Sequence, residues 1–206
     1  MKIILFRHGE KQKVDSVVAD DKKRVKLTDL GVDQINKLGK ALLERFPSLA
    51  FSKVIYSSHY ARAIQSAEIV KTILNIQNII IIPEFGEFYA SDDYRKPKEI
   101  RQEIQKMAMN NPDLISPETG FSLNDVILKF KNKIKEICEE KSSDLILIST
   151  HGGIIRNTVY SLDPKSKPNS ELIAEAKIHE GGYTVLDFDG QNFSVDEFDI
   201  HDYLVD

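Results

Sequence analysis

The chain has 206 residues, of which 41% are hydrophobic and 29% are charged, and its formal net charge is −4. This length and composition are typical of one globular domain with a substantial core, so we expect a single domain over residues 1–206. The acidic balance gives no overall basic field that would attract nucleic acid or an anionic membrane. We therefore expect neither as a partner, and any bound anion must be held by a local cluster of cations.

The sequence also indicates a compartment. One Lys and a short apolar run lead directly into charged residues at the N-terminus, unlike a signal peptide. No apolar stretch approaches the ~20 residues that span a bilayer. The single cysteine, Cys138, excludes an intrachain disulfide and a cysteine-based zinc cage. These features predict a cytoplasmic protein in which Cys138 is an inert core residue.

Strand and helix patterns alternate along most of the chain, which predicts an α/β fold with a mostly parallel central sheet. The first four apolar runs are nearly continuous, as expected for central strands covered on both faces. The last two predict a hairpin across Asp189-Gly190-Gln191. In chain order, the predicted strands are Lys2–Phe6, Lys53–Tyr56, Asn78–Ile82, Asp144–Ser149, Tyr183–Phe188 and Phe193–Phe198.

Apolar residues at helical spacing predict helices between these strands. Thr28 is a candidate N-cap for a helix that buries its apolar face, and a second helix is predicted over Tyr60–Leu74. A third is predicted over Leu123–Cys138, with Ser122 or Asn124 as its cap. Helices in these gaps would give a three-layer α/β/α arrangement.

The segment from about residue 88 to 121 departs from this alternation. It is rich in charge, contains no good strand, and has a predicted helix near Pro97–Met109. We interpret it as a small helical cap insertion over the C-terminal edge of the sheet, where such a segment can gate a site. The cations Arg95, Lys96 and Lys98 fit a solvated helix end within it.

Chemically active side chains follow three of the predicted strands. His8 comes after the first strand beside Arg7, Arg62 comes shortly after the second, and His151 follows the fourth. Ligands of open α/β sheets bind outside the carboxyl ends of the strands. Guanidinium groups suit phosphoryl oxygens, and an imidazole held by backbone through one nitrogen can attack phosphorus with the other. The pattern predicts phosphoryl transfer to His8, which the arginines keep unprotonated.

Departure of the leaving group needs a proton, so a carboxylic acid is expected near these groups. Glu87 and Glu84 both lie just beyond the third predicted strand, and spacing from Arg62 favours Glu87. Asp92 and Asp93 in the cap are further alternatives. Partial burial under the cap should raise the pKa of the true acid.

Three sequence motifs occur in a recognisable order. They are Leu5-Phe6-Arg7-His8-Gly9-Glu10, the string YSSHYARAIQSAE from Tyr56 to Glu68, and Ser149-Thr150-His151-Gly152-Gly153. Together with Leu27-Thr28-Asp29-Leu30-Gly31 and Gln34, they resemble the histidine phosphatase superfamily, which includes the cofactor-dependent phosphoglycerate mutases. The middle string is the most specific because it is long and lies between the other two.

The resemblance implies a phosphoglycerate-mutase-like fold and a phosphohistidine intermediate. It implies that His8 is the phosphorylated nucleophile and that Glu87 is the acid and base. His151 joins the two arginines around the phosphate. The site residues are thus catalytic His8, Glu87 and His151 and substrate-binding Arg7, Arg62 and Gly152.

Some positions depart from the family pattern. Lys11 stands where relatives usually have Ser or Thr, and Val14 stands where mutases and many phosphatases carry Asn. Gly120-Phe121-Ser122 lacks the Glu often found between Gly and Ser, and the insertion lacks a paired-arginine segment of the mutase type. These departures leave the core chemistry intact but argue against a mutase and a glycolytic substrate. The prediction is a metal-independent phosphomonoesterase acting on a small phosphorylated metabolite. A cofactor-dependent phosphoglycerate mutase and a non-catalytic phospholigand-binding protein are the alternatives.

No metal and no cofactor are expected. His8 and His151 lack a nearby third ligand, and the arginines would repel a cation. The remaining histidines, His59, His179 and His201, are predicted at the surface or the pocket rim. Of these three, His59 is the candidate for a contact with substrate. Glu10 is expected to be structural, and a homodimer is left open.

Overall fold

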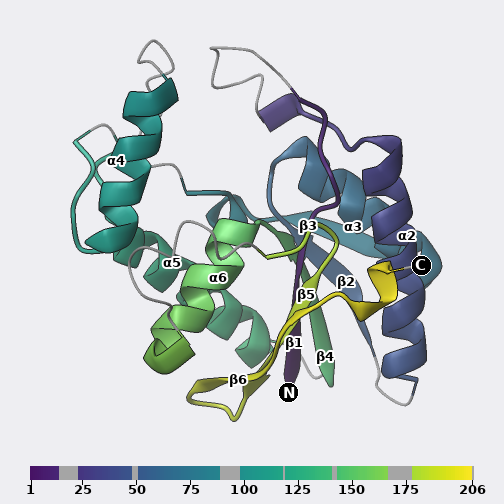
Figure 1. Ribbon diagram of the computed structural model, residues 1–206. Helices are drawn as coiled ribbons and strands as arrows, with labels where there is room; N and C mark the ends of the chain where they lie inside the picture. Colours follow the sequence, from purple (N-terminus) through teal and green to yellow (C-terminus); the bar gives the residue numbers. More distant parts are fainter. Residues whose placement is uncertain are drawn as a thin grey trace.

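The computed structural model describes residues 1–13, 23–47, 51–88, 98–117, 119–140, 143–166 and 178–205. At its centre is a six-stranded sheet in the order β3-β2-β4-β1-β5-β6 (Figure 1). Its strands are β1 (Lys2–Arg7), β2 (Phe51–Ser57), β3 (Asn78–Ile81), β4 (Leu145–Thr150), β5 (Tyr183–Phe188) and β6 (Phe193–Ile200). Strands β1 to β4 run parallel to one another. Strand β5 pairs antiparallel with β1, and β6 pairs antiparallel with β5. A mostly parallel sheet is thus confirmed.

Helices cover both faces of the sheet. They are α2 (Asp29–Arg45), α3 (Ala61–Ile73), α4 (Lys98–Asn110), α5 (Leu123–Glu140) and α6 (Gly152–Leu162). Helices α2 and α3 lie on one side and α5 and α6 on the other, as Figure 1 shows, so the expected three-layer α/β/α architecture is confirmed. Short 3₁₀ helices span Pro83–Phe85, Pro164–Ser166 and Asp202–Leu204. In the described ranges, no helix is long and apolar enough to cross a membrane.

The alternation of side chains along β1 explains how the sheet joins two cores. Ile3 and Leu5 pack in the cluster that contains α5 and α6, whereas Ile4 and Phe6 pack in the cluster that contains α2 and α3. All four are 0% exposed. Because burying one such side chain contributes roughly 1.5–3 kcal/mol, this strand fixes the frame that carries the groups at its end.

The prediction for the third strand is wrong in one respect. The run Asn78–Ile82 was expected to form a central strand covered on both faces, but β3 is an edge strand, and Ile80 and Ile81 are each 41% exposed. An apolar run favours strand formation without indicating which neighbours will cover it. The second strand is also longer than the predicted Lys53–Tyr56, since β2 starts at Phe51.

The structure confirms the predicted N-caps of two helices. Thr28 Oγ1 accepts a hydrogen bond from the backbone N–H of Gly31 at 3.0 Å and so caps α2. Ser122 Oγ accepts one from the N–H of Asp125 at 3.1 Å, which selects Ser122 over Asn124 as the cap of α5. Both hydroxyls satisfy donors that a helix start leaves unpaired.

The predicted hairpin between β5 and β6 is confirmed. Gly190 has φ +100°, a conformation that favours glycine. The Asp189 carboxylate accepts hydrogen bonds from the N–H groups of Gln191 and Asn192 at 2.8 and 2.7 Å, which closes the turn.

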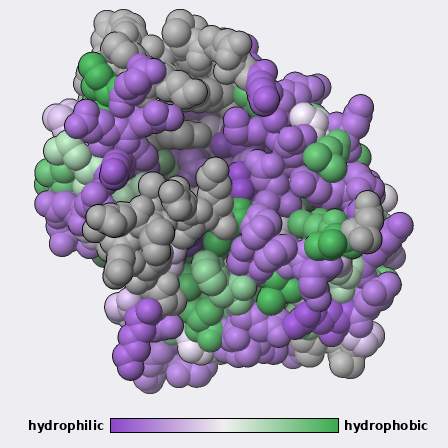
Figure 2. Space-filling model, in the orientation of Figure 1, coloured by the Kyte–Doolittle hydropathy of each residue, from purple (hydrophilic) through white to green (hydrophobic). Residues whose placement is uncertain are grey.

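The segment interpreted above as a cap insertion contains α4, which Figure 1 shows beside α5, toward the upper left of the sheet. Ala108 of α4 is buried in the same core cluster as α5. Figure 2 shows that this face of the molecule is largely hydrophilic, with smaller hydrophobic patches. Several residues considered above lie outside the described ranges, namely Val14, Asp92, Asp93, Arg95 and Lys96, and the side chain of Lys98 is not described either.

Candidate active site

His8 directly follows β1 and is 2% exposed. Its Nδ1 lies 2.8 Å from the carbonyl oxygen of Gly9, and the Nε–H of Arg62 donates to its Nε2 at 2.9 Å. This network assigns the proton to Nδ1 and leaves the lone pair on Nε2. Burial, followed by the positive charge of Arg62, holds the pKa of His8 well below its usual value of 6.5. His8 is thus a neutral imidazole whose Nε2 lone pair accepts a hydrogen bond from the Arg62 guanidinium.

The turn after β1 is fixed by close backbone packing. A Cβ on Gly9 would collide with the backbone of Gly31 in α2, so only glycine fits there. The N–H of His8 donates to the carbonyl of Thr150 at 3.3 Å, and the N–H of Gly9 donates to Ser66 Oγ at 3.4 Å. The imidazole is therefore held by β4 and α3 as well as by its own strand.

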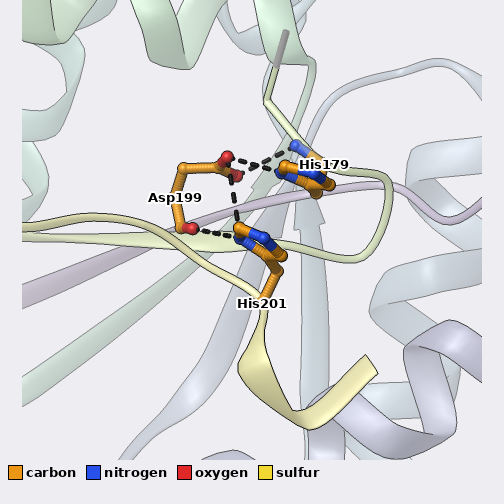
Figure 3. Close-up of side chains that lie close together, drawn as sticks. All are labelled: His179, Asp199 and His201. Carbon is orange, nitrogen blue, oxygen red and sulfur yellow. Dashed lines mark hydrogen bonds and ion pairs between the residues drawn. The ribbon is translucent and has the colours of Figure 1, made fainter. Parts of the chain in front are cut away.

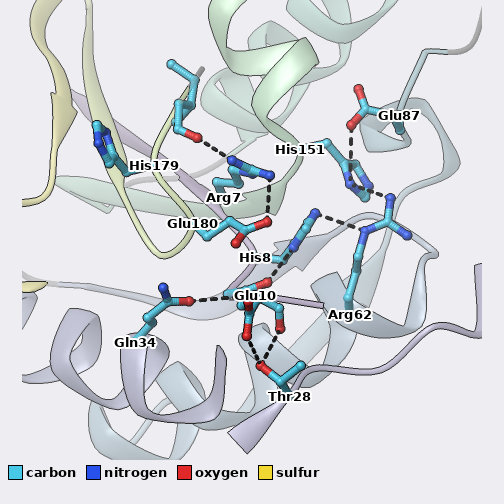
Figure 4. A network of polar contacts seen from close by, with 12 residues as sticks. Arg7, His8, Glu10, Thr28, Gln34, Arg62, Glu87, His151, His179 and Glu180 are labelled. Carbon is cyan, nitrogen blue, oxygen red and sulfur yellow. Dashed lines mark hydrogen bonds and ion pairs between the residues drawn. The ribbon is translucent and has the colours of Figure 1, made fainter. Parts of the chain in front are cut away.

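His151 is the N-cap residue of α6 and is completely buried. Its Nε2 lies 2.8 Å from Ser58 Oγ, and its Nδ1 lies 3.2 Å from Nη2 of Arg62. The ring centroids of His8 and His151 are 5.3 Å apart. Burial and then Arg62 also hold the pKa of His151 well below 6.5. Arg62 consequently bridges two neutral imidazoles (Figure 4).

Arg62 occupies the first turn of α3, as expected, and is 2% exposed. Its guanidinium lies 4.6 Å from the ring centre of Tyr60, a distance typical of a cation–π contact. Neither α3 nor α6 has a side-chain cap, and both begin beside these imidazoles. Two helix N-termini and a buried guanidinium favour an anion at this place.

Arg7 ends β1 on the other side of His8. Its Nη1 donates to the carbonyl of Ile178, and its Nη2 donates to Glu180 at 2.9 Å. Its Nε is buried and has no hydrogen-bond partner among the described residues. A buried donor without an acceptor costs stability, so Arg7 Nε indicates that an acceptor binds there. A Cβ on Gly152 would lie 3.1 Å from Arg7 Cδ, so this glycine lets Arg7 pack against the start of α6.

Glu87 brings a carboxylate to the same group of residues. Its Oε2 lies 3.9 Å from Nδ1 of His151, and its side chain is 18% exposed. Burial raises the pKa of Glu87 above 4.5, against the opposing effect of Arg62 and Arg7. A Cβ on Gly153 would lie 2.5 Å from Oε1 of Glu87, so this glycine makes room for the carboxyl group.

Glu84, the alternative candidate for the proton donor, occupies a different position. Glu84 lies in the 3₁₀ helix Pro83–Phe85 and is exposed. It lines a cavity of about 240 Å³, which Glu87 also lines, together with His59, Phe88 and Phe121. The contact between Glu87 and His151 therefore favours Glu87 over Glu84 as a proton donor in the imidazole pocket.

Sequence reasoning gave no role to several residues that the structure brings into the site. Ser58 orients His151, Tyr60 packs against Arg62, and Glu180 holds Arg7. The charge of Arg156 opposes the rise in the pKa of Glu87 that burial causes, and Nη2 of Arg156 lies 3.6 Å from the sulfur of Met109 in α4. Ser58 and Tyr60 lie inside the middle motif, which was a usable signal, whereas no local pattern marks Arg156 or Glu180.

Two further positions behave differently from the catalytic candidates. Glu10 is structural, as expected, since its Oε2 accepts from Thr28 Oγ1 at 2.6 Å and its N–H donates to Gln34 at 2.7 Å (Figure 4). Burial, and then the charge of Arg62, lower the pKa of Lys11. The effect of Arg62 and Arg7 on this pKa places Lys11 at the border of the imidazole pocket.

Comparisons with known proteins agree with this arrangement. The family model for the histidine phosphatase superfamily (branch 1) matches residues 3–201. Phosphoglycerate mutase-like protein 4 of Arabidopsis thaliana is 25% identical over 199 residues, covering 94% of this chain and 82% of its own.

Solved structures share the fold at lower identity. A phosphoserine phosphatase of Entamoeba histolytica, in complex with phosphoserine, has a TM-score of 0.72 at 18% identity, with 99% of both chains covered. The alpha-ribazole phosphatase of Shigella flexneri has a TM-score of 0.68 at 21% identity, covering 98% of this chain and 97% of its own.

Proposed function

Since the chain belongs to branch 1 of the histidine phosphatase superfamily, we propose that it is a metal-independent phosphomonoesterase that works through a phosphohistidine. The observation that carries this proposal is the pocket around His8. Its Nε2 lone pair faces Arg62, and the buried Nε–H of Arg7 has no partner among the described residues. A phosphoryl oxygen would accept hydrogen bonds from both guanidiniums and bring phosphorus to the nucleophilic nitrogen.

The first step transfers the phosphoryl group to His8. The Nε2 lone pair forms a bond to phosphorus while the bond from phosphorus to the alcohol oxygen breaks. Protonated Glu87 donates its proton to that departing oxygen. Arg7 and Arg62 stabilise the charge on the phosphoryl oxygens in the transition state. The carbonyl of Gly9 holds the Nδ1 proton and stabilises the positive ring that results.

The second step releases phosphate. The Glu87 carboxylate formed in the first step removes a proton from water, and the resulting oxygen attacks the phosphorus on His8. The bond between phosphorus and Nε2 breaks, and its electron pair returns to the ring. Glu87 is then protonated again, so the raised pKa of this carboxyl suits both of its tasks.

The size of the neighbouring cavity supports a small substrate. It has a volume of about 240 Å³ and extends from Glu87 toward the cap, with Phe88 and Phe121 among its lining residues. The alcohol part of the substrate would lie here, next to the proton donor. The two solved relatives act, by their names, on different small phosphate esters. We propose that the substrate is likewise a small phosphorylated metabolite.

The direct experiment measures phosphate release from a panel of small phosphomonoesters at pH 5.5 and 7.5, with and without a strong chelator. We expect turnover of at least one of them that the chelator does not reduce, because arginines take the place of metal ions. Activity that the chelator abolishes and divalent metal restores would contradict the metal-independent mechanism.

Two further results would replace the proposal by another function. Phosphoryl transfer to a second hydroxyl that depends on a bisphosphorylated primer would identify a mutase. Tight binding of phosphate esters with no turnover of any of them would identify a phospholigand-binding protein.

A further inference from the structure

A second group of chemically active side chains lies apart from the imidazole pocket. It consists of His179, which lies shortly before β5, and Asp199 and His201 at the end of β6 (Figure 3). Each can offer one ligand atom, and these three atoms lie within 4.8 Å of one another. Among the described residues, this is the set of His, Cys, Asp and Glu side chains that could hold a metal ion.

Asp199 is the centre of this cluster. Its Oδ2 lies 2.7 Å from Nδ1 of His179 and 3.7 Å from Nδ1 of His201. Its Oδ1 accepts the backbone N–H of His179 at 2.9 Å. The Nδ1 of His201 lies 2.6 Å from the backbone carbonyl oxygen of Asp199, so at present it hydrogen-bonds that carbonyl and only approaches the carboxylate (Figure 3).

The burial of the three groups suits an ion that enters from solvent. The Asp199 side chain is 14% exposed, whereas those of His179 and His201 are 54% and 38% exposed. The carboxylate supplies a partly buried negative charge beneath two accessible imidazoles. Asp202 adds a further negative charge directly after His201. This balance of charge is opposite to that around His8, where guanidiniums surround the rings.

We propose that His179, Asp199 and His201 bind a divalent transition-metal ion of the zinc class. Two imidazoles and a carboxylate are ligands that Zn²⁺ accepts, and a water molecule would complete a four-coordinate site. With zinc–ligand distances of about 2.0–2.2 Å, ligand atoms in a tetrahedral site lie roughly 3.3 Å apart. This spacing falls between the 2.7 and 3.7 Å that now separate Asp199 Oδ2 from the two Nδ1 atoms.

Binding requires three local changes. The Nδ1 of His201 must leave the carbonyl oxygen of Asp199, from which it now lies 2.6 Å. The metal takes the place of the Nδ1 protons, so each neutral ring keeps its proton on Nε2 and any imidazolium releases one proton. The rings are now stacked, with centroids 3.5 Å apart and planes at 13°, so both planes cannot contain one ion. The rings must therefore turn apart, and their exposure leaves room for this rotation.

The position of the cluster relates it to the imidazole pocket. His179 lies between Ile178, whose carbonyl accepts from Arg7, and Glu180, whose carboxylate also accepts from Arg7. A metal that joins His179 to the end of β6 would fix the segment that holds the Arg7 guanidinium. The ion would act as a structural clamp and would take no part in the phosphoryl transfer.

The test titrates the full-length protein, without an affinity tag, with Co²⁺ and follows the visible absorption of tetrahedral cobalt. Calorimetry with Zn²⁺ provides an independent measure. We expect one ion per chain, with at least tenfold weaker binding in His201→Ala and in Asp199→Asn. His59→Ala is the matched control, since it removes a half-buried histidine outside the cluster, and it should bind as the parent does.

Thermal unfolding keeps the test independent of activity. Zn²⁺ should raise the Tm of the parent and not that of His201→Ala, and Mg²⁺ should raise neither. The absence of saturable binding, or equal binding in the parent and both cluster variants, would overturn the proposal. Loss of binding in His59→Ala but not in His201→Ala would also overturn it. None of these readouts requires phosphatase activity.

Discussion

The protein contains two pairs of neighbouring histidines in opposite electrostatic surroundings. His8 and His151 are buried, share the guanidinium of Arg62, and have pKa values held well below 6.5. His179 and His201 are partly exposed and both approach the carboxylate of Asp199. The same side chain therefore serves different chemistry according to its neighbours. A neutral imidazole beside a cation suits an anionic substrate, and an imidazole beside a carboxylate suits a cation.

The sharpest test of this comparison removes one histidine from each pair. His8→Ala should lower phosphatase turnover by at least about 10⁴-fold, because it removes the nucleophile of the first step. His201→Ala should lower it by less than tenfold, because that ring lies outside the imidazole pocket. Steady-state kinetics on one substrate, with Tm values to verify folding, measure both. Similar losses in the two variants would show that the pairs do not differ in function.

The second prediction concerns the cation that distinguishes the pairs. Arg62→Ala should reduce kcat/KM by about 10²–10³-fold, equivalent to roughly 2.7–4 kcal/mol of transition-state stabilisation. Lys133→Ala removes a partly exposed cation of α5 and should change kcat/KM less than twofold. Because Arg62 is buried, Arg62→Lys is measured as a second variant. It should retain the positive charge but lose the bidentate hydrogen bonding of the guanidinium to phosphoryl oxygens. Full activity in both Arg62 variants would mean that the phosphate binds elsewhere.

The third prediction separates Glu87 from Glu84 through the leaving group. A general acid matters most for a strongly basic alkoxide and little for a stable phenolate. Glu87→Gln should therefore reduce turnover of an alkyl phosphate by at least about tenfold more than turnover of p-nitrophenyl phosphate. Glu84→Gln should leave both rates nearly unchanged. If Glu84→Gln shows the leaving-group-dependent defect, the acid is misassigned. If neither variant shows it, the acid is another residue, for which Asp92 and Asp93 are the next candidates.

The fourth and smallest effect is on pH dependence. The pKa of Glu87 is raised above 4.5 by burial and that of His8 is lowered below 6.5, so acid and nucleophile coexist on the acidic side of neutral. The kcat/KM for an alkyl phosphate should decline as pH rises through the pKa of Glu87. Glu87→Gln should lack this decline, whereas titration of the substrate itself affects both proteins equally.

Stability provides the same test without substrate. A carboxyl with a raised pKa in the folded protein stabilises it fully below the unfolded value of 4.5, and this contribution is lost as pH rises through the folded pKa. The Tm of Glu87→Gln should therefore improve relative to the parent between pH 4.5 and pH 8. A constant difference in Tm across this range would show that the pKa of Glu87 is not raised.

The sequence predicted those features that depend on local signals. The apolar runs end at Phe6 and Ile148, within two residues of the strand ends at Arg7 and Thr150, so the positions of His8 and His151 beyond the strands followed directly. The cap Thr28 was likewise predictable from its side chain and the helical pattern after it. Helix caps and strand ends are decided by a few neighbouring residues, and single-sequence reasoning reaches them.

The features that sequence reasoning missed depend on contacts between distant segments. The edge position of β3 follows from its pairing with β2 alone, which an apolar run does not reveal. Glu180 reaches Arg7 across 173 positions of the chain. The Asp199 carboxylate meets the two rings only because the β5–β6 hairpin brings the segments before and after it together. No periodicity or motif records such tertiary contacts.

The most direct measurement of the central claim is the site of covalent phosphorylation. The protein would be mixed briefly with a ³²P-labelled phosphomonoester and quenched in alkaline denaturant, and the labelled peptide would be mapped. We predict label on His8 that is stable in base, is released by acid, and is missing in His8→Ala. Acid-stable label, or label that persists in His8→Ala, would contradict a mechanism in which His8 carries the phosphoryl group.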